Sequence, residues 1–156
     1  MAYEKSKGML SVATSYSSGT DTYYYEKIDK YLEASSLNIT PDQMQDLDSY
    51  VNANGILKRA TMPYSRSKIE ANIKYCNGNT MDEMMNILKK GTSVKDGISS
   101  ENKVRIRFYN PKKMEYSYAW AYFPDITYNV YTTSNGFAVY TATRIAFITY
   151  GEKANT

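Results

Sequence analysis

The sequence predicts an α+β fold made mainly of antiparallel strands, with one flanking helix. Several segments alternate between apolar and polar residues, which is the period of a strand with one buried face. One segment, residues 80–90, has the spacing and the end signals of a helix. Short turns rich in Asn, Gly and Pro separate the alternating segments, as expected between antiparallel neighbours.

The first 45 residues are expected to form an N-terminal extension with short helices. Residues 8–16 contain a short apolar run that favours a strand. In residues 21–35 apolar side chains recur at helical spacing, which predicts a helix, although the three consecutive tyrosines there suit a strand equally well. Residues 40–52 begin with a Thr-Pro-Asp-Gln capping box and predict a second helix, followed by a turn at Asn54–Gly55.

The next two elements have the clearest patterns. Residues 65–75 alternate strictly and predict a strand whose buried face carries Ile69 and Ile73. In residues 80–90, Thr80 and Glu83 match a capping box, and two lysines followed by Gly91 match a helix end. We therefore expect this helix to lie between two strands.

The remaining elements are predicted strands joined by turns. Residues 103–109 and 114–122 are joined by a turn at residues 110–113 into a hairpin. Residues 126–133 and 137–150 flank an Asn-Gly pair and predict a second hairpin. We expect one domain of 156 residues, with an extension over 1–45, a connecting arm over 46–64 and a β core with its helix over 65–151.

Composition argues against several kinds of active site. The chain contains no histidine and a single cysteine, Cys76, so a Ser-His or Cys-His pair, the usual zinc ligand sets and an internal disulfide are excluded. No phosphate-binding glycine motif is present. We expect no enzymatic activity, no cofactor and no metal. The net charge of +3 is too small to indicate sequence-specific nucleic-acid binding, and no apolar run is long enough to predict a membrane span.

Two sets of residues are candidates for recognition, although neither has catalytic chemistry. The connecting arm carries a turn and a basic pair, and its candidate assembly residues are Asn54, Gly55, Ile56, Leu57, Lys58, Arg59, Met62 and Tyr64. The second set is an aromatic row on one face of a strand, comprising Tyr116, Tyr118, Trp120 and Tyr122. Packing of the aromatic row onto a helix is the favoured interpretation, and a glycan-binding platform is the alternative.

The 17 tyrosines and one basic strand add to this picture. Tyrosine is typical of strand surfaces that are partly exposed to water and of interfaces. Lys103, Arg105 and Arg107 lie on one face of the predicted strand 103–109. A solvated face is the favoured interpretation of these three cations, and contact with nucleic acid or with an acidic neighbour is the alternative.

From Asp46 to Gly151, the order and spacing of segments resemble small tail proteins of bacteriophages that infect Gram-positive bacteria, an uncharacterised family encoded near the tail tape measure. The segments that carry the resemblance are Asp46–Ser49, Gly55–Arg59, Lys68–Glu70, Thr80–Leu88, Val104–Tyr109, Tyr116–Tyr131 and Arg144–Tyr150. This resemblance covers about two-thirds of the chain.

The resemblance implies a β-sandwich or barrel of the tail-tube type, which forms rings, often hexamers, with a long arm that reaches the neighbouring ring. It implies a structural virion protein of the tail tube, connector, terminator or distal tail. The implied partners are copies of the chain, other phage tail proteins and the tape measure, with assembly in the host cytoplasm. A tyrosine-rich module that binds cell-surface glycan and a small phage inhibitor of a host protein are the alternatives.

Overall fold

A large antiparallel sheet organises the computed structural model, which describes residues 3–46, 49–134 and 136–153. In its described part the sheet has eight strands, in the order β13-β6-β12-β9-β8-β1-β2, with β3 also paired to β6. Their bounds are β1 Leu10–Ser17, β2 Thr22–Lys27, β3 Asn38–Asp46, β6 Thr61–Ile73, β8 Lys103–Asn110, β9 Glu115–Tyr122, β12 Thr143–Thr149 and β13 Glu152–Lys153. The expected α+β class with mainly antiparallel strands is confirmed.

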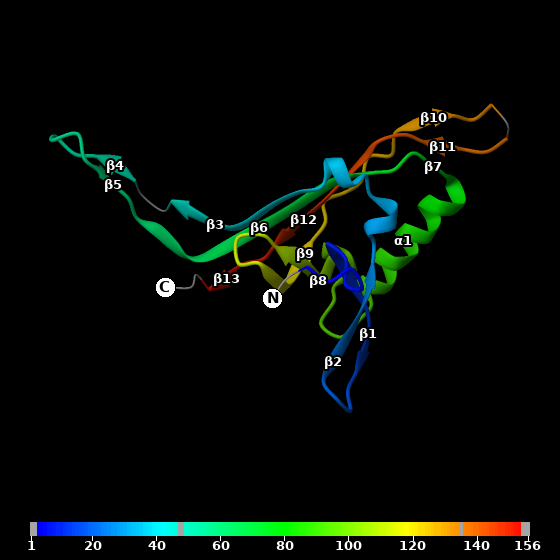
Figure 1. Cartoon of the computed structure of the whole chain (residues 1–156), viewed down its shortest axis with the longest axis horizontal. Coiled ribbons are helices and arrows are strands. Elements are labelled where there is room, and N and C mark those ends of the chain that lie inside the picture. Colours follow the sequence, from blue (N-terminus) through cyan, green and yellow to red (C-terminus); the bar gives the residue numbers. More distant parts are fainter. Residues whose placement is uncertain (1–2, 47–48, 135, 154–156) are drawn as a thin grey trace.

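The helix α1, Gly78–Thr92, packs against β1 and β8 on one face of this sheet (Figure 1). Its buried residues Met81, Met84 and Leu88 recur at helical spacing, as the sequence predicts. The predicted N-cap was misplaced, because Asn77 caps the helix by accepting the N–H of Thr80 at 3.0 Å. At the other end Lys89 and Lys90 lie in the last turn as expected, but the helix continues to Thr92, so Gly91 lies inside it and close to β1.

The core lies between α1 and the sheet. The alternating patterns in β6, β8 and β12 place their apolar residues toward the helix, and residues such as Ile69, Ile106 and Phe147 are fully buried. The expected strand at residues 8–16 is confirmed as β1, which contributes Leu10 and Val12 to the same core. Burial of these side chains is the main source of stability for the fold.

Both helices expected in the first 52 residues were wrong. Residues 22–27 form β2, followed by the short 3-10 turns η1 Asp29–Tyr31 and η2 Ala34–Ser36. Residues 38–46 form β3, in which Thr40 pairs with Lys68 of β6. Pairing with the open side of β6 is a long-range interaction, and such tertiary context overrides the weak local preference for a helix. The predicted helix over 40–52 also included residues 47 and 48, which lie outside the described residues.

Two smaller sheets complete the structure. One contains β7 Cys76–Asn77, β10 Val130–Thr132 and β11 Val139–Tyr140, and the other contains β4 Tyr50–Val51 and β5 Leu57–Lys58. The predicted strand at 126–133 is therefore only three residues long, and the predicted strand at 137–150 is split into β11 and β12. The predicted loop at 91–102 contains the short 3-10 turn η3 Ser99–Glu101. The hairpin between β10 and β11 is confirmed, and Asn135 in its turn lies outside the described residues.

The overall shape is a body with extensions. Figure 1 shows β3 and β6 running from the body toward β4 and β5, which lie at the end opposite α1. The β1–β2 hairpin and the β10–β11 hairpin project in other directions. The connecting arm predicted at residues 46–64 is thus the outer part of a β hairpin whose legs are β3 and β6.

Candidate functional site

The arm, residues 46–64, ends in a self-contained turn. β4 and β5 pair through Tyr50 with Lys58 and through Val51 with Leu57. The side-chain oxygen of Asn52 accepts the N–H groups of Asn54 and Ile56, at 3.0 Å each. The predicted turn at Asn54–Gly55 is therefore present, and Gly55 adopts a φ of 78° that a side chain would strain.

The tip of the arm exposes apolar side chains. Val51 is 63% exposed and Leu57 59%, and Tyr50 and Ile56 are also more than half exposed. Lys58 is exposed as well, and Arg59 forms an ion pair with Asp46. The arrangement can offer a contact surface of mixed apolar and basic character, but it holds no group suited to acid–base or nucleophilic chemistry.

The base of the arm is tied to the body. The N–H of Ser67 donates to the Thr149 hydroxyl at 2.8 Å in a buried position, and the N–H of Asp42 donates to the Ser67 hydroxyl at 3.0 Å. Tyr64 pairs with Lys153 of β13, and its side chain is 57% exposed. Met62 lies in β6, and its side chain is not among those described. These contacts fix the direction in which the arm leaves the sheet.

The aromatic row of β9 lies on the sheet face opposite α1. Ala119 and Ala121 are buried toward the helix side, so Tyr116, Tyr118, Trp120 and Tyr122 point the other way. The expected packing of this row onto a helix was therefore wrong. The row instead contacts tyrosines of other strands, with ring centres 5.8 Å apart for Tyr23 and Trp120 and 5.6 Å for Tyr25 and Tyr118.

The cations of β8 lie among these rings, and we call the whole surface the outer face: Tyr23, Tyr25, Lys103, Arg105, Arg107, Tyr116, Tyr118, Trp120 and Tyr122. Cross-strand pairing places Arg105 opposite Trp120 and Arg107 opposite Tyr118. The alternation of the three cations was visible in the sequence. The contribution of Tyr23 and Tyr25 was missed because residues 21–35 were expected to be helical.

Burial affects the tyrosines of this surface. Removal from water raises the pKa of Tyr25 above its ordinary value of 10.0, and the hydrogen bond from Arg105 partly counteracts that rise. Burial also raises the pKa of Tyr23, with a further contribution from Asp96. Both phenols therefore stay neutral through the physiological range and keep their hydroxyl donors.

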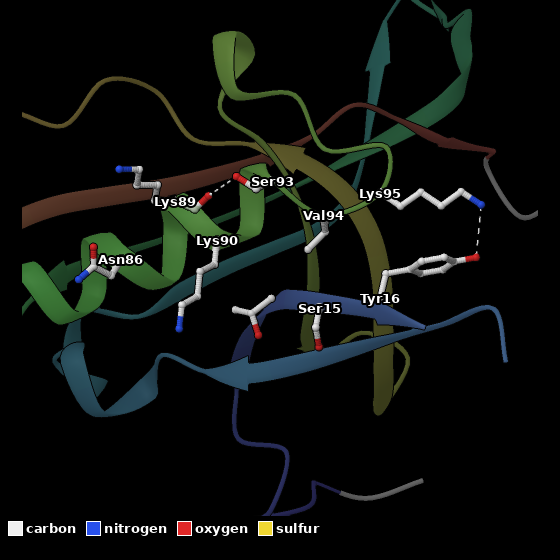
Figure 2. Close-up of a pocket in the computed structure, with 9 residues that line it drawn as sticks. Ser15, Tyr16, Asn86, Lys89, Lys90, Ser93, Val94 and Lys95 are labelled. Carbon is white, nitrogen blue, oxygen red and sulfur yellow. Dashed lines mark hydrogen bonds between the residues drawn. The ribbon is translucent and has the colours of Figure 1, made fainter. Parts of the chain in front are cut away.

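An open depression of about 630 Å³ lies between the C-terminal half of α1 and β1 (Figure 2). Lys89, Lys90 and Lys95 line it, and Lys95 donates to the Tyr16 hydroxyl at 3.3 Å. Lysines at a helix C-terminus are explained by the negative end of the helix dipole. Ser93 likewise donates to the carbonyl of Lys89 at 3.1 Å, so its hydroxyl is satisfied within the helix end.

The described part of the chain shows no cluster of three or more acidic, cysteine or histidine residues that could hold a metal ion. None of its helices has the length and apolar character needed to cross a membrane. Cys76 is buried, and burial raises the pKa of its thiol, which makes it a packing residue and a poor nucleophile.

Comparison with known proteins gives one match. The model of a family of unknown function, DUF6711, matches residues 24–150, which include most of β2, the arm, β12 and all of the outer face except Tyr23. No curated protein and no solved structure matches the chain. Because the matched region spans most of the sequence, the chain belongs to the DUF6711 family.

Proposed function

We propose that the chain is a non-enzymatic structural subunit of a bacteriophage tail that assembles with further copies of itself, and that the arm makes the contact between subunits. The observation that carries this proposal is the exposed apolar tip, Tyr50, Val51, Ile56 and Leu57, on a hairpin that extends beyond the body (Figure 1). Docking onto a neighbouring subunit would remove these side chains from water.

The physical reason lies in the instability of isolated hairpins. A two-stranded hairpin in water is marginal, because no core covers either face. Single exposed apolar residues are ordinary, but adjacent ones on a protruding element mark an interaction site. The Asn52 turn keeps the tip folded, so that little ordering is needed when a partner binds.

The edges of the main sheet support assembly in a ring. In the described part of the sheet, β2, β3 and β13 each pair with a single neighbour, and Tyr24 of β2 is 54% exposed. Unpaired edges invite further strands. A head-to-tail contact that closes on itself covers one edge of every subunit with the opposite edge of the next.

The tail assignment rests on the order of segments from Asp46 to Gly151 and on its resemblance to phage tail proteins. The proposal includes the tail-tube type of β-sandwich or barrel, a ring of six copies, contacts with other tail proteins and the tape measure, and a place in the virion after assembly in the host cytoplasm. The glycan-binding alternative has less support, because cations lie over the ring of Trp120.

The test compares the full chain with a variant that lacks residues 54–62. Light scattering and negative-stain microscopy should show rings for the full chain, alone or after addition of the tail proteins encoded beside it. The shortened chain should remain a folded monomer, because its core residues and α1 are untouched.

Met114→Ser provides a matched control, since Met114 is 59% exposed on the turn between β8 and β9 and lies outside the arm. It should assemble like the full chain. The proposal fails if the full chain stays monomeric with every tail partner, or if the shortened chain forms unchanged rings.

A further inference from the structure

We propose that the outer face binds an extended acidic polypeptide, whose carboxylates contact Lys103, Arg105 and Arg107. This inference concerns a surface on the body and does not depend on assembly through the arm. The single observation behind it is a row of three cations held by aromatic rings instead of by carboxylates.

The cations have aromatic neighbours on the same face. The guanidinium of Arg105 lies 5.4 Å from the ring centre of Tyr23 and 5.6 Å from that of Trp120. Arg107 lies 5.1 Å from the ring centre of Tyr25, and the ammonium of Lys103 lies 5.3 Å from that of Trp120. Contacts of this kind hold a cation in place without neutralising its charge.

Carboxylates do not neutralise this row in the described part of the chain. The ion pairs found there join other side chains, such as Arg144 with Glu70 and Lys113 with Asp42. Glu101 lies at the border of the face and accepts the hydroxyl of Tyr150 at 3.1 Å. The outer face therefore carries three cations that have no ion-pair partner among the described residues, with Asp96 near Tyr23 and Glu101 near Tyr150.

The hydrogen bonds of the two arginines leave donors unused. Arg105 donates through Nε to the Tyr25 hydroxyl at 3.2 Å, and its described bonds do not involve the two terminal nitrogens. Arg107 donates through one terminal nitrogen to Ser11 and Lys7, while its buried Nε has no partner among the described residues. A nearby anion would offset the cost of this desolvated charge, and Arg105 offers the paired donors that a carboxylate accepts.

The spacing of the cations matches an extended chain. Alternate residues on a strand repeat at about 6.8 Å, so Lys103, Arg105 and Arg107 form a regular row. An extended polypeptide with Asp or Glu at alternate positions has the same repeat and can bring a carboxylate to each cation.

A single-stranded nucleic acid fits this surface less well. Proteins that bind such strands stack bases on free aromatic faces. Here the rings of Tyr23, Tyr25 and Trp120 already have cations over them. Stacked bases would have to displace those cations, whereas carboxylates would bind them where they lie.

Trp120 is the only tryptophan in the chain, so its fluorescence reports directly on the outer face. We would titrate the full chain with an alternating Glu-Thr peptide, with a Gln-Thr peptide of the same length and with oligo-dT. The acidic peptide should change the Trp120 emission in a saturable way that weakens with added salt. The neutral peptide should have no effect, and oligo-dT should bind more weakly.

Two charge-matched double variants locate the binding. Arg105→Gln with Arg107→Gln should weaken binding of the acidic peptide about tenfold or more, since hydrogen-bonded charges on the outer face are removed. Lys89→Gln with Lys90→Gln removes the same charge from α1, on the other side of the sheet, and should leave binding within about twofold. Arg105→Lys keeps the charge and should retain part of the affinity even where the double glutamine variant folds poorly.

The proposal is overturned by no binding of the acidic peptide, by tighter binding of oligo-dT or by an equal loss in the two double variants.

Discussion

Asn52 and Ile56 close the tip of the arm through two hydrogen bonds. The side-chain oxygen of Asn52 accepts the N–H of Ile56 at 3.0 Å, and its backbone N–H donates to the carbonyl of Ile56 at 2.9 Å. These hydrogen bonds of the turn are therefore made within the tip itself. This explains how an apolar tip can remain ordered while it is exposed to water.

Replacing Asn52 with Ala should loosen the tip without affecting the core. The N–H groups of Asn54 and Ile56 lose their acceptor, which costs about 1 kcal/mol locally. Amide hydrogen exchange at these two positions should become about fivefold faster, and exchange in α1 should not change. Equal rates in both proteins would show that the side chain does not hold the turn.

Gly91→Ala should destabilise the whole protein. A Cβ at this position would lie 2.7 Å from Cγ1 of Val12 and 3.1 Å from Cγ1 of Val104, so the helix would have to move away from the sheet. The expected loss in the free energy of unfolding is about 1–3 kcal/mol, measured by urea denaturation.

Gly19→Ala is the matched control for that substitution. Its Cβ would meet no atom within 4 Å, and the turn that contains it is exposed. This variant should be as stable as the full chain or slightly more stable, because alanine restricts the unfolded state. An equal loss in the two variants would contradict the close approach of α1 to β1.

Asp29→Ala should also lower stability. The Asp29 carboxylate accepts the N–H of Met9 at 2.7 Å and the N–H of Leu10 at 3.0 Å, where the chain enters β1. Removing both acceptors beside a buried leucine should cost about 2 kcal/mol. Asp29→Asn keeps one acceptor, so its free energy of unfolding should fall less in the same urea measurement. A larger loss in Asp29→Asn than in Asp29→Ala would be inconsistent with this role.

Stability should fall at alkaline pH. Burial raises the pKa of Tyr25 above 10.0 in the folded protein, so the unfolded chain loses that proton first as the pH rises past 10. The folded state then binds more protons than the unfolded state, and the free energy of unfolding decreases with pH above about 10. Below that range the contribution of Tyr25 is fully present.

Urea denaturation at pH 8 to 11 measures this decrease. Tyr25→Phe removes the titrating group, so the free energy of unfolding of this variant should decrease less steeply with pH than that of the unchanged protein. Tyr24→Phe is the control, because Tyr24 is 54% exposed on the same strand. If the free energy of unfolding falls equally steeply with pH in all three proteins, Tyr25 does not contribute to the pH dependence.

The elements that the sequence predicts correctly are those with a buried face of their own. β6, β8 and α1 each show a regular apolar period, and the core confirms it. The strand β9 was also predicted, but its aromatic row was assigned to the face that packs on the helix, and Ala119 and Ala121 occupy that face instead. The predicted helix over 40–52 failed because Thr40 and Pro41 match a helix start locally, while the open side of β6 determines the outcome. The sequence of β3 carries no periodic signal of this long-range pairing with β6.

The candidate site was predictable to a similar extent. The turn at Asn54–Gly55 and the row from Tyr116 to Tyr122 follow from turn chemistry and from alternation. The contact between Arg105 and Tyr23 could not be predicted, because these residues are far apart in the sequence. The pairings of β1 with β2 and of β1 with β8 bring them together, and no local pattern encodes these pairings.

The central claim, that the arm contacts another copy of the chain, is tested most directly by photo-crosslinking. A photoreactive amino acid at position 57 would be compared with the same group at position 114, since Leu57 and Met114 are each 59% exposed. With two differently tagged copies under assembly conditions, position 57 should give a covalent product that carries both tags, and position 114 should give little. Crosslinking from position 57 that is no greater than from position 114 would contradict the claim.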